Sequence, residues 1–297
     1  MNFNKLDFVV IGAQKCATSW MFYCLREHPE LSLPIKKQEL GYIGGEMFYA
    51  EGKEDWFFRR FVEKSSATLR GDVSVDYLYD KTACQVLKGY MNLDNAKFIV
   101  SLRNPVDRMI SSYFWLLRRG RLKYLPMEEG IQSILQQPFG FPNTLPGALE
   151  EVVRRGCYHD QLKCYIDLFG KESICVVLYE DVLKDSLETI QSVYRFLEIE
   201  DSFVPPSLRV KPKKNSYNRL MIKFERWFNN KCGIKIANVI NQALTSVKDS
   251  KLGLSEETRF KLQELYEPEV QATKKLIMSL PESQRPSCKT LDDFWGY

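Results

Sequence analysis

A short polar stretch, residues 14–21, carries the residue types that bind phosphate groups. It follows an apolar run at residues 6–12 that is typical of a buried strand, and the residues after Ser19 are typical of a helix. The first N–H groups of a helix have no internal acceptor and carry the positive end of its dipole. Lys15 adds a full charge, and Thr18 and Ser19 add hydroxyl donors. The stretch is therefore predicted to cradle a phosphate.

This loop differs from a Walker A loop, because one glycine precedes Lys15 by three positions and no second glycine flanks it. An ordinary helix N-terminus with a solvated lysine is the alternative, and this stretch alone leaves it open.

A second block, residues 97–113, has the same order of strand, turn and helix. Arg103 leaves the strand at its carboxyl end, Pro105 suits the first helical position, and Ser111 faces back from the second turn. The guanidinium group offers a planar fork of donors, so Arg103 and Ser111 suit a second phosphate. A structural pair between Arg103 and Asp107 is the alternative. The presence of both blocks in one chain favours two phosphate sites.

These two blocks resemble the cofactor-binding elements of the sulfotransferases that use PAPS (3′-phosphoadenosine 5′-phosphosulfate) and release PAP. The string at residues 102–108, followed by Ser-Ser-Tyr at 111–113, is similar to the branch that includes heparan sulfate sulfotransferases and many bacterial relatives. The resemblance covers roughly residues 6–280. It implies that the first block grips the 5′-phosphosulfate through Lys15, Ala17, Thr18, Ser19 and Trp20, and that Arg103 and Ser111 hold the 3′-phosphate. Ala17 stands where relatives commonly have glycine, and it can still expose its N–H if its φ is negative.

A basic segment at residues 209–235 contains nine Lys or Arg residues and Glu225 as its one acidic residue. The resemblance implies that this part of the chain covers the nucleotide. The residues expected there are Lys213, Lys214, Asn215 and Ser216, and Tyr158 in the Gly-Cys-Tyr string is also expected on the cofactor side. A solvated helix face or a nucleic-acid patch is the alternative.

Sulfuryl transfer requires a cation where charge builds on the leaving oxygen, and a general base for the acceptor. Lys15 is placed for the first task. Glu39 occupies the position where the heparan-type branch carries its presumed base, although Gln38 replaces the neighbouring lysine, whose charge Lys36 or Lys37 could supply.

The other titratable candidates for the reaction are weaker. The two histidines, His28 before a proline and His159 at the start of a helix, are poor candidates for the base. Asp72 and Tyr77 are expected in acceptor binding, or in support of the residues that bind the acceptor.

Strand-like and helix-like segments alternate along the chain, which predicts an α/β fold with a central parallel sheet flanked by helices on both faces. Ligands of such sheets bind beyond the carboxyl ends of the strands, where both phosphate sites fall. We expect one P-loop-like sulfotransferase domain over residues 1–297, with an acceptor-side lid at 120–156 and the basic cofactor-covering segment at 209–235.

Composition limits the class of protein without naming the acceptor. The 297 residues are 44% hydrophobic with a net charge of +4, and no apolar run approaches a membrane span. From the short segment before the first strand we expect no signal peptide. The eight cysteines form no C-x-x-C pair, which favours reduced thiols, no metal and a cytoplasmic enzyme. The expected acceptor is a hydroxyl or amine of a small molecule or natural product, with no nucleic acid or membrane partner; the oligomeric state is open. A P-loop-like nucleotide kinase and a non-catalytic nucleotide- or nucleic-acid-binding module are the alternatives.

Overall fold

The computed structural model describes residues 5–37, 42–62, 64–118, 127–135, 152–209 and 254–296. The chain divides into two compact units. The first contains residues 1–104, 157–212 and 269–297, and the second contains residues 105–156 and 213–268.

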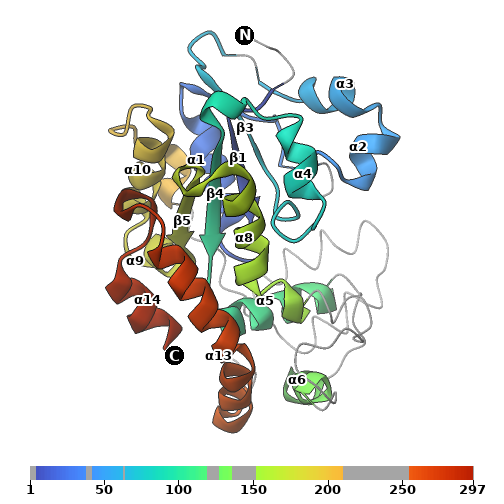
Figure 1. Ribbon diagram of the computed structural model, residues 1–297, viewed down its shortest axis with the longest axis vertical. Coiled ribbons are helices and arrows are strands. Elements are labelled where there is room, and N and C mark those ends of the chain that lie inside the picture. The colour runs from blue at the N-terminus through green and yellow to red at the C-terminus, as the bar shows by residue number, and fades with distance from the viewer. Residues whose placement is uncertain are drawn as a thin grey trace, which may run out of the picture. The chain divides into compact units, whose positions relative to one another are not determined.

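The first unit is built around five strands and the helices that connect them (Figure 1). Its strands are β1 (Phe8–Gly12), β2 (Leu31–Ser32), β3 (Leu69–Val73), β4 (Lys97–Leu102) and β5 (Ile174–Leu178). Its helices are α1 (Thr18–Glu27), α2 (Glu46–Ala50), α3 (Lys53–Phe58), α4 (Ala83–Lys88), α8 (Tyr158–Phe169), α9 (Tyr179–Lys184), α10 (Ser186–Leu197) and α14 (Cys288–Trp295), together with the C-terminal part of α13 (Glu256–Met278).

The five strands form one sheet in the order β2-β3-β1-β4-β5, and every neighbouring pair is parallel. The central strand β1 pairs with β3 through Phe8↔Gly71 and with β4 through Phe8↔Lys97. This sheet confirms the α/β fold class predicted from the alternation of elements. Since parallel strands end at the same edge, the loops that follow β1, β3, β4 and β5 meet there.

Alternate residues of the buried strands face two different layers of helices. Val10, Ile99 and Val177 belong to a core cluster with side chains of α1 and α10. On the other face the Phe98 ring contacts the rings of two α8 residues, Tyr165 and Phe169, with centroids 5.2 and 4.4 Å away. Figure 1 shows α8 in front of the sheet. The sheet is thus covered by helices on both faces.

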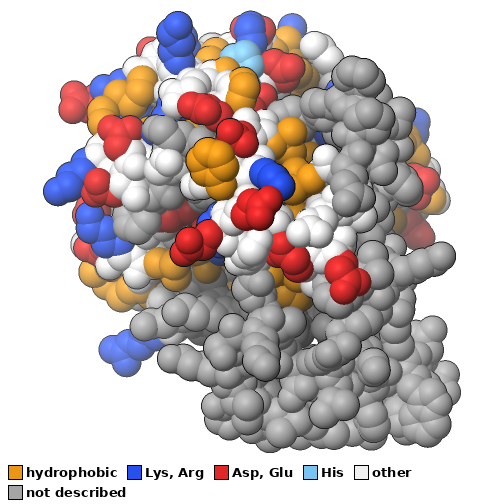
Figure 2. Space-filling model, turned by 90° about the horizontal axis from the view of Figure 1, so that it is seen from below, with side chains coloured by type: hydrophobic (Ala, Val, Ile, Leu, Met, Phe, Trp, Pro, Cys, Tyr) orange, Lys and Arg blue, Asp and Glu red, His pale blue; other side chains and the backbone are white. Residues whose placement is uncertain are grey.

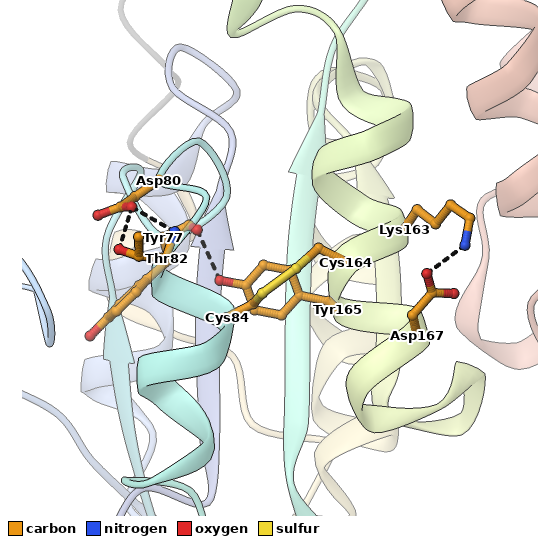
Figure 3. Close-up of a disulfide and its surroundings, with 8 residues drawn as sticks. All are labelled: Tyr77, Asp80, Thr82, Cys84, Lys163, Cys164, Tyr165 and Asp167. Atoms are coloured by element: carbon orange, nitrogen blue, oxygen red, sulfur yellow. Dashed lines mark hydrogen bonds and ion pairs between the residues drawn. A yellow bond between two sulfur atoms is a disulfide. The ribbon is translucent and has the colours of Figure 1, made fainter.

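A disulfide between Cys84 of α4 and Cys164 of α8 joins two helices of this second layer (Figure 3). The expectation of reduced thiols throughout is wrong for this pair. The two cysteines lie 80 positions apart, and only the packing of α4 against α8 brings their Cα atoms to 6.8 Å. Next to it, the Tyr165 hydroxyl donates a hydrogen bond to the Tyr77 carbonyl, 2.9 Å away.

The second unit contains α5 (Pro105–Arg118), α6 (Met127–Leu135) and the N-terminal part of α13. Glu128 of α6 accepts hydrogen bonds from the Ser255 N–H and hydroxyl, at 3.0 and 2.8 Å, at the start of α13. Asp107 of α5 pairs with Arg259 of α13 at 3.0 Å. Asp107 therefore has a basic partner other than the Arg103 that the sequence offered as an alternative.

The strand at residues 97–102, which Arg103 follows directly, has the bounds predicted from the sequence. The predictions of one domain over 1–297, with a lid at 120–156 and a basic segment at 209–235, stay predictions. Most of both segments lies outside the described residues, which include 127–135 and 152–156 of the first and Arg209 of the second.

On the described part of the face in Figure 2, acidic and basic side chains are interspersed.

Candidate active site

The loop between β1 and α1 has an unusual backbone conformation. Lys15 and Ala17 adopt positive φ angles of 72° and 63°, in the left-handed region that L-residues avoid. The sequence analysis required a negative φ at Ala17 for its N–H to be exposed, and the observed φ is positive. A left-handed residue followed by the helical Thr18 is an arrangement that turns successive N–H groups toward one side, as anion-binding loops do.

The first turn of α1 offers donors and no negative charge. The helical ladder begins with the Met21 N–H, which donates to the Ala17 carbonyl at 3.1 Å, so the N–H groups of Thr18, Ser19 and Trp20 precede it. None of the residues in this turn is acidic. The positive end of the helix dipole is thus left for an external anion.

Lys37 adds a second cation to this helix end, although the sequence offered it only as a possible substitute for a displaced charge. Its Nζ donates to the Thr18 hydroxyl at 3.2 Å and to the Ser19 hydroxyl at 3.0 Å. The described structure therefore brings the Lys37 ammonium group to the two hydroxyl groups of a helix whose preceding loop carries Lys15. Sequence spacing could not show this, because Lys37 comes 18 positions after Ser19.

Two side chains connect this loop to the end of β4. The Ser101 hydroxyl donates to the Cys16 carbonyl at 2.5 Å, and the Ala13 N–H donates to the Ser101 carbonyl at 2.7 Å. The Tyr158 hydroxyl donates to the Arg103 carbonyl at 2.9 Å and lies 3.9 Å from the Cys16 sulfur. The first cradle and the turn that carries Arg103 are thus parts of one connected assembly.

The Arg103 guanidinium lies over the ring of Tyr179, with its Cζ 4.2 Å from the ring centroid. Its Nε is buried and has no acceptor among the described residues. Glu180, directly after Tyr179, accepts the Asn104 N–H at 3.0 Å. Sequence reasoning missed Tyr179 and Glu180, the first two residues after β5.

Ser111 lies on α5 and is buried. Arg103 belongs to the first unit and Ser111 to the second. That the two side chains meet on one phosphate stays a prediction.

Two residues expected to contact the cofactor are more deeply buried than a ligand contact needs. The Trp20 side chain is 4% exposed and belongs to the core cluster, and its indole Nε1 has no acceptor among the described residues. Tyr158 is 1% exposed and its hydroxyl is engaged by Arg103. Trp20 could reach a phosphate through its main-chain N–H, while Tyr158 supports the turn.

Asp72 and Tyr77 form a buried pair at the end of β3. The Tyr77 hydroxyl donates to Asp72 Oδ2 at 2.8 Å and accepts the Ile43 N–H at 3.0 Å. Burial raises the pKa of the Asp72 carboxyl, while Tyr77 and the charges of Arg60 and Lys37 act in the opposite direction. Because these two side chains bond to each other and to Ile43, the geometry favours a supporting role for Asp72 and Tyr77 over direct contact with the acceptor. Ile43 lies two positions after residues 38–41, the segment that contains Glu39.

Neither histidine is positioned as a base for the cradle. The ring of His28 is used by the Glu200 carbonyl at 2.9 Å and by the Glu30 N–H at 3.2 Å, and burial lowers the pKa of His28. The His159 ring pairs with Asp160 at 2.8 Å.

Several predicted site residues lie outside the described residues. They are Glu39, the candidate base, and the candidate cofactor-covering residues Lys213, Lys214, Asn215 and Ser216. Glu39 is nevertheless bracketed by described contacts: Lys37 binds the helix α1 hydroxyls before it, and Ile43 binds Tyr77 after it.

The described residues contain no group of three or more His, Cys, Asp or Glu residues that could hold a metal ion. They also contain no helix with the length and apolar character needed to cross a membrane.

A parallel α/β sheet with cationic, donor-rich loops after two adjacent strands defines a class of α/β proteins whose ligand sites lie beyond the carboxyl ends of the strands. The sequence profile of the sulfotransferase domain matches residues 5–274. The chain therefore belongs to the sulfotransferase family, the PAPS-dependent group whose resemblance the two phosphate-binding blocks carry.

Individual relatives are more distant. The chain is 31% identical over 138 residues to the membrane-associated sulfotransferase kil1 of Dictyostelium discoideum, a match that covers 44% of this chain and 27% of that protein. It is 21% identical over 227 residues to a bifunctional heparan sulfate N-deacetylase/N-sulfotransferase 1 of Caenorhabditis briggsae, covering 72% of this chain and 25% of that protein. The chain thus spans about a quarter of the length of these two curated relatives.

Among solved structures, a sulfotransferase from Alicyclobacillus acidocaldarius superposes with a TM-score of 0.65 at 22% identity. The superposition covers 96% of this chain and 98% of that one. This likeness establishes the shared fold.

Proposed function

We propose that this protein transfers the sulfuryl group of PAPS to a hydroxyl or amine of a small-molecule acceptor and releases PAP. The observation that carries the proposal is the connection between two donor-rich loops at the ends of β1 and β4, made by Ser101 and Tyr158. A ligand with two separate phosphate-type groups, such as PAPS, fits two such loops.

The residues present fit an anionic nucleotide. Thr18, Ser19 and Trp20 offer main-chain N–H groups that precede the helical ladder, beside the cations Lys15 and Lys37. The buried Nε of Arg103 lacks a protein acceptor within the described chain. Buried donors of this kind are normally satisfied, so an oxygen-rich ligand would complete them.

PAPS supplies an activated sulfuryl group when bound. Lys15 is proposed to stabilise the charge that develops on the leaving oxygen, because a preorganised cation acts where charge grows during the reaction. Lys37 is proposed to share this task, since its Nζ already lies at the hydroxyls of the helix end. Lys37 would thereby replace the lysine that is absent at Gln38.

Glu39 is proposed as the general base that takes the proton of the acceptor. Lys37 and Ile43 hold the chain on either side of it. Asp72 and Tyr77 would act on the acceptor side by fixing Ile43. The residues proposed to cover the nucleotide are Lys213, Lys214, Asn215 and Ser216. We also propose that the enzyme is cytoplasmic.

The test is a transfer assay with labelled PAPS against a panel of small alcohols, phenols and amines, combined with calorimetry of PAP and ATP. The proposal expects PAP to bind far more tightly than ATP and at least one acceptor class to become labelled. Retention of ATP rather than PAP would support the nucleotide kinase instead. Salt-sensitive binding of nucleic acid without any PAP binding would support the non-catalytic module. No observation within the described residues favours either alternative.

A further inference from the structure

Arg103 and Tyr179 are brought together by the register of the sheet. Strands β4 and β5 run parallel with Leu102 paired to Leu178, and each of these residues is the last of its strand. The next residue along each chain is Arg103 on one side and Tyr179 on the other. The contact between guanidinium and ring, 4.2 Å from Cζ to centroid, follows from this pairing.

The corner between β5 and α9 also holds the backbone of the turn. Glu180 Oε1 accepts the Asn104 N–H at 3.0 Å, and the Tyr158 hydroxyl donates to the Arg103 carbonyl at 2.9 Å. Tyr179 and Glu180 are both buried, with 8% of each residue exposed. The main chain around Arg103 is therefore fixed from two sides, and the Tyr179 ring fixes the plane of the side chain.

The guanidinium of Arg103 contacts an aromatic ring and leaves its N–H groups available for a ligand. No carboxylate pairs with its guanidinium within the described chain, and the one described contact of that group is the face of an aromatic ring. A ring attracts a guanidinium through its face and leaves the N–H groups along the edge directed outward. A carboxylate would occupy that edge and compete with an incoming phosphate.

We propose that Tyr179 is a positioning residue for Arg103 and thereby sets the preference of the site for nucleotides with a 3′-phosphate, an inference that rests on the proposed function. Its ring, and not its hydroxyl, performs this role. The ring contact to a partly buried guanidinium stabilises it enough that losing the ring should weaken the phosphate contact about 3- to 30-fold.

The experiment compares calorimetric affinities for PAP and AMP, since AMP lacks the 3′-phosphate. Tyr179→Leu is expected to reduce the preference for PAP over AMP about 3- to 30-fold without changing AMP affinity. Tyr179→Phe keeps the ring and should restore the preference. In an Arg103→Ala background, Tyr179→Leu should have no further effect, because the cation that it positions is gone.

Two controls separate positioning from loss of a core side chain. Tyr194→Leu removes another buried tyrosine, on α10, and should leave the ratio of PAP to AMP affinity unchanged. Tyr179→Met, with an unbranched and more adaptable side chain of similar volume to leucine, provides the same comparison if Tyr179→Leu does not fold.

The outcomes distinguish this inference from the proposed function. If the wild type prefers PAP over AMP and Tyr179→Leu or Tyr179→Met keeps that preference, the positioning role of Tyr179 is overturned while the proposed function stands. Equal losses from Tyr179→Leu with and without Arg103 also overturn it. A wild type that binds PAP and AMP equally overturns both the 3′-phosphate site and this inference.

Discussion

The hydroxyl of Tyr158 donates a hydrogen bond to the main-chain carbonyl of Arg103 and at the same time lies 3.9 Å from the sulfur of Cys16. Cys16 belongs to the loop that opens α1, and Arg103 to the turn after β4. One buried ring at the start of α8 therefore contacts both candidate phosphate loops. Their spacing is set by the protein before any nucleotide binds, which lowers the ordering entropy that binding must overcome.

Lys15→Ala should lower turnover about 10²- to 10³-fold, because one preorganised charge contact to the developing charge is lost. PAP binding should be partly retained, since Arg103 lies in a separate loop. Steady-state rates and calorimetry measure the two effects. Lys88→Ala on α4, an exposed lysine, is the matched control for loss of one charge. Activity of Lys15→Ala within a few-fold of wild type would exclude a catalytic role for Lys15.

Arg103→Ala should weaken PAP binding by roughly 1.5–3 kcal/mol and leave AMP binding nearly unchanged, because a charge-assisted contact to the 3′-phosphate is removed. Ser111→Ala tests in the same way whether Ser111 reaches this phosphate. Calorimetry with both nucleotides is the measurement, and Arg59→Ala, with an 81% exposed side chain, is the control. Equal losses for PAP and AMP would contradict the assignment.

Ala17→Gly should raise the free energy of unfolding by about 0.5–1 kcal/mol. A φ of 63° strains alanine and not glycine, and this relief exceeds the entropy that glycine adds to the unfolded chain. Urea unfolding followed by circular dichroism measures it. Ala83→Gly, at a right-handed helical position of α4, should have the opposite sign. Destabilisation by Ala17→Gly would argue against the left-handed conformation.

The Cys84–Cys164 disulfide should stabilise the fold against unfolding by about 2–4 kcal/mol, because it closes a loop of 80 residues in the unfolded chain. Reducing agent should lower the melting temperature of the wild type and have little effect on a Cys84→Ala/Cys164→Ala variant. Peptide mapping without reduction should recover the linked peptides. A melting temperature that is insensitive to reductant in the wild type would show that the bond contributes nothing.

Glu39→Gln should lower turnover about 10²- to 10⁴-fold at saturating PAPS, because the amide cannot accept the acceptor's proton. PAP affinity should change little. Asp72→Asn and His159→Ala are the comparisons, since Asp72 is engaged by Tyr77 and His159 by Asp160. Loss of turnover in either comparison, with Glu39→Gln still active, would move the role of base elsewhere.

The local parts of the two candidate phosphate sites could be predicted from the amino-acid sequence alone. The apolar run before Gly12, the hydroxyl residues at the start of α1 and the Arg-Asn-Pro turn at 103–105 predicted two strand–turn–helix blocks, and the structure has them. These signals are local, because burial of a short apolar run and the opening of a helix depend on neighbouring residues. The predicted base and the predicted lid are equally local proposals; Glu39 and most of residues 120–156 lie outside the described residues.

The distant residues that support those two blocks could be identified only in the folded structure. Lys37 reaches the α1 hydroxyls, Tyr179 stacks on Arg103, and Cys84 bonds to Cys164 because of strand order and helix packing, which no local pattern encodes. The backbone of Ala17 is a further case: a left-handed alanine is disfavoured locally by about 1–2 kcal/mol, and the surrounding loop imposes it. Contacts between residues far apart in sequence depend on the register of parallel strands, and that register exists only in the folded sheet.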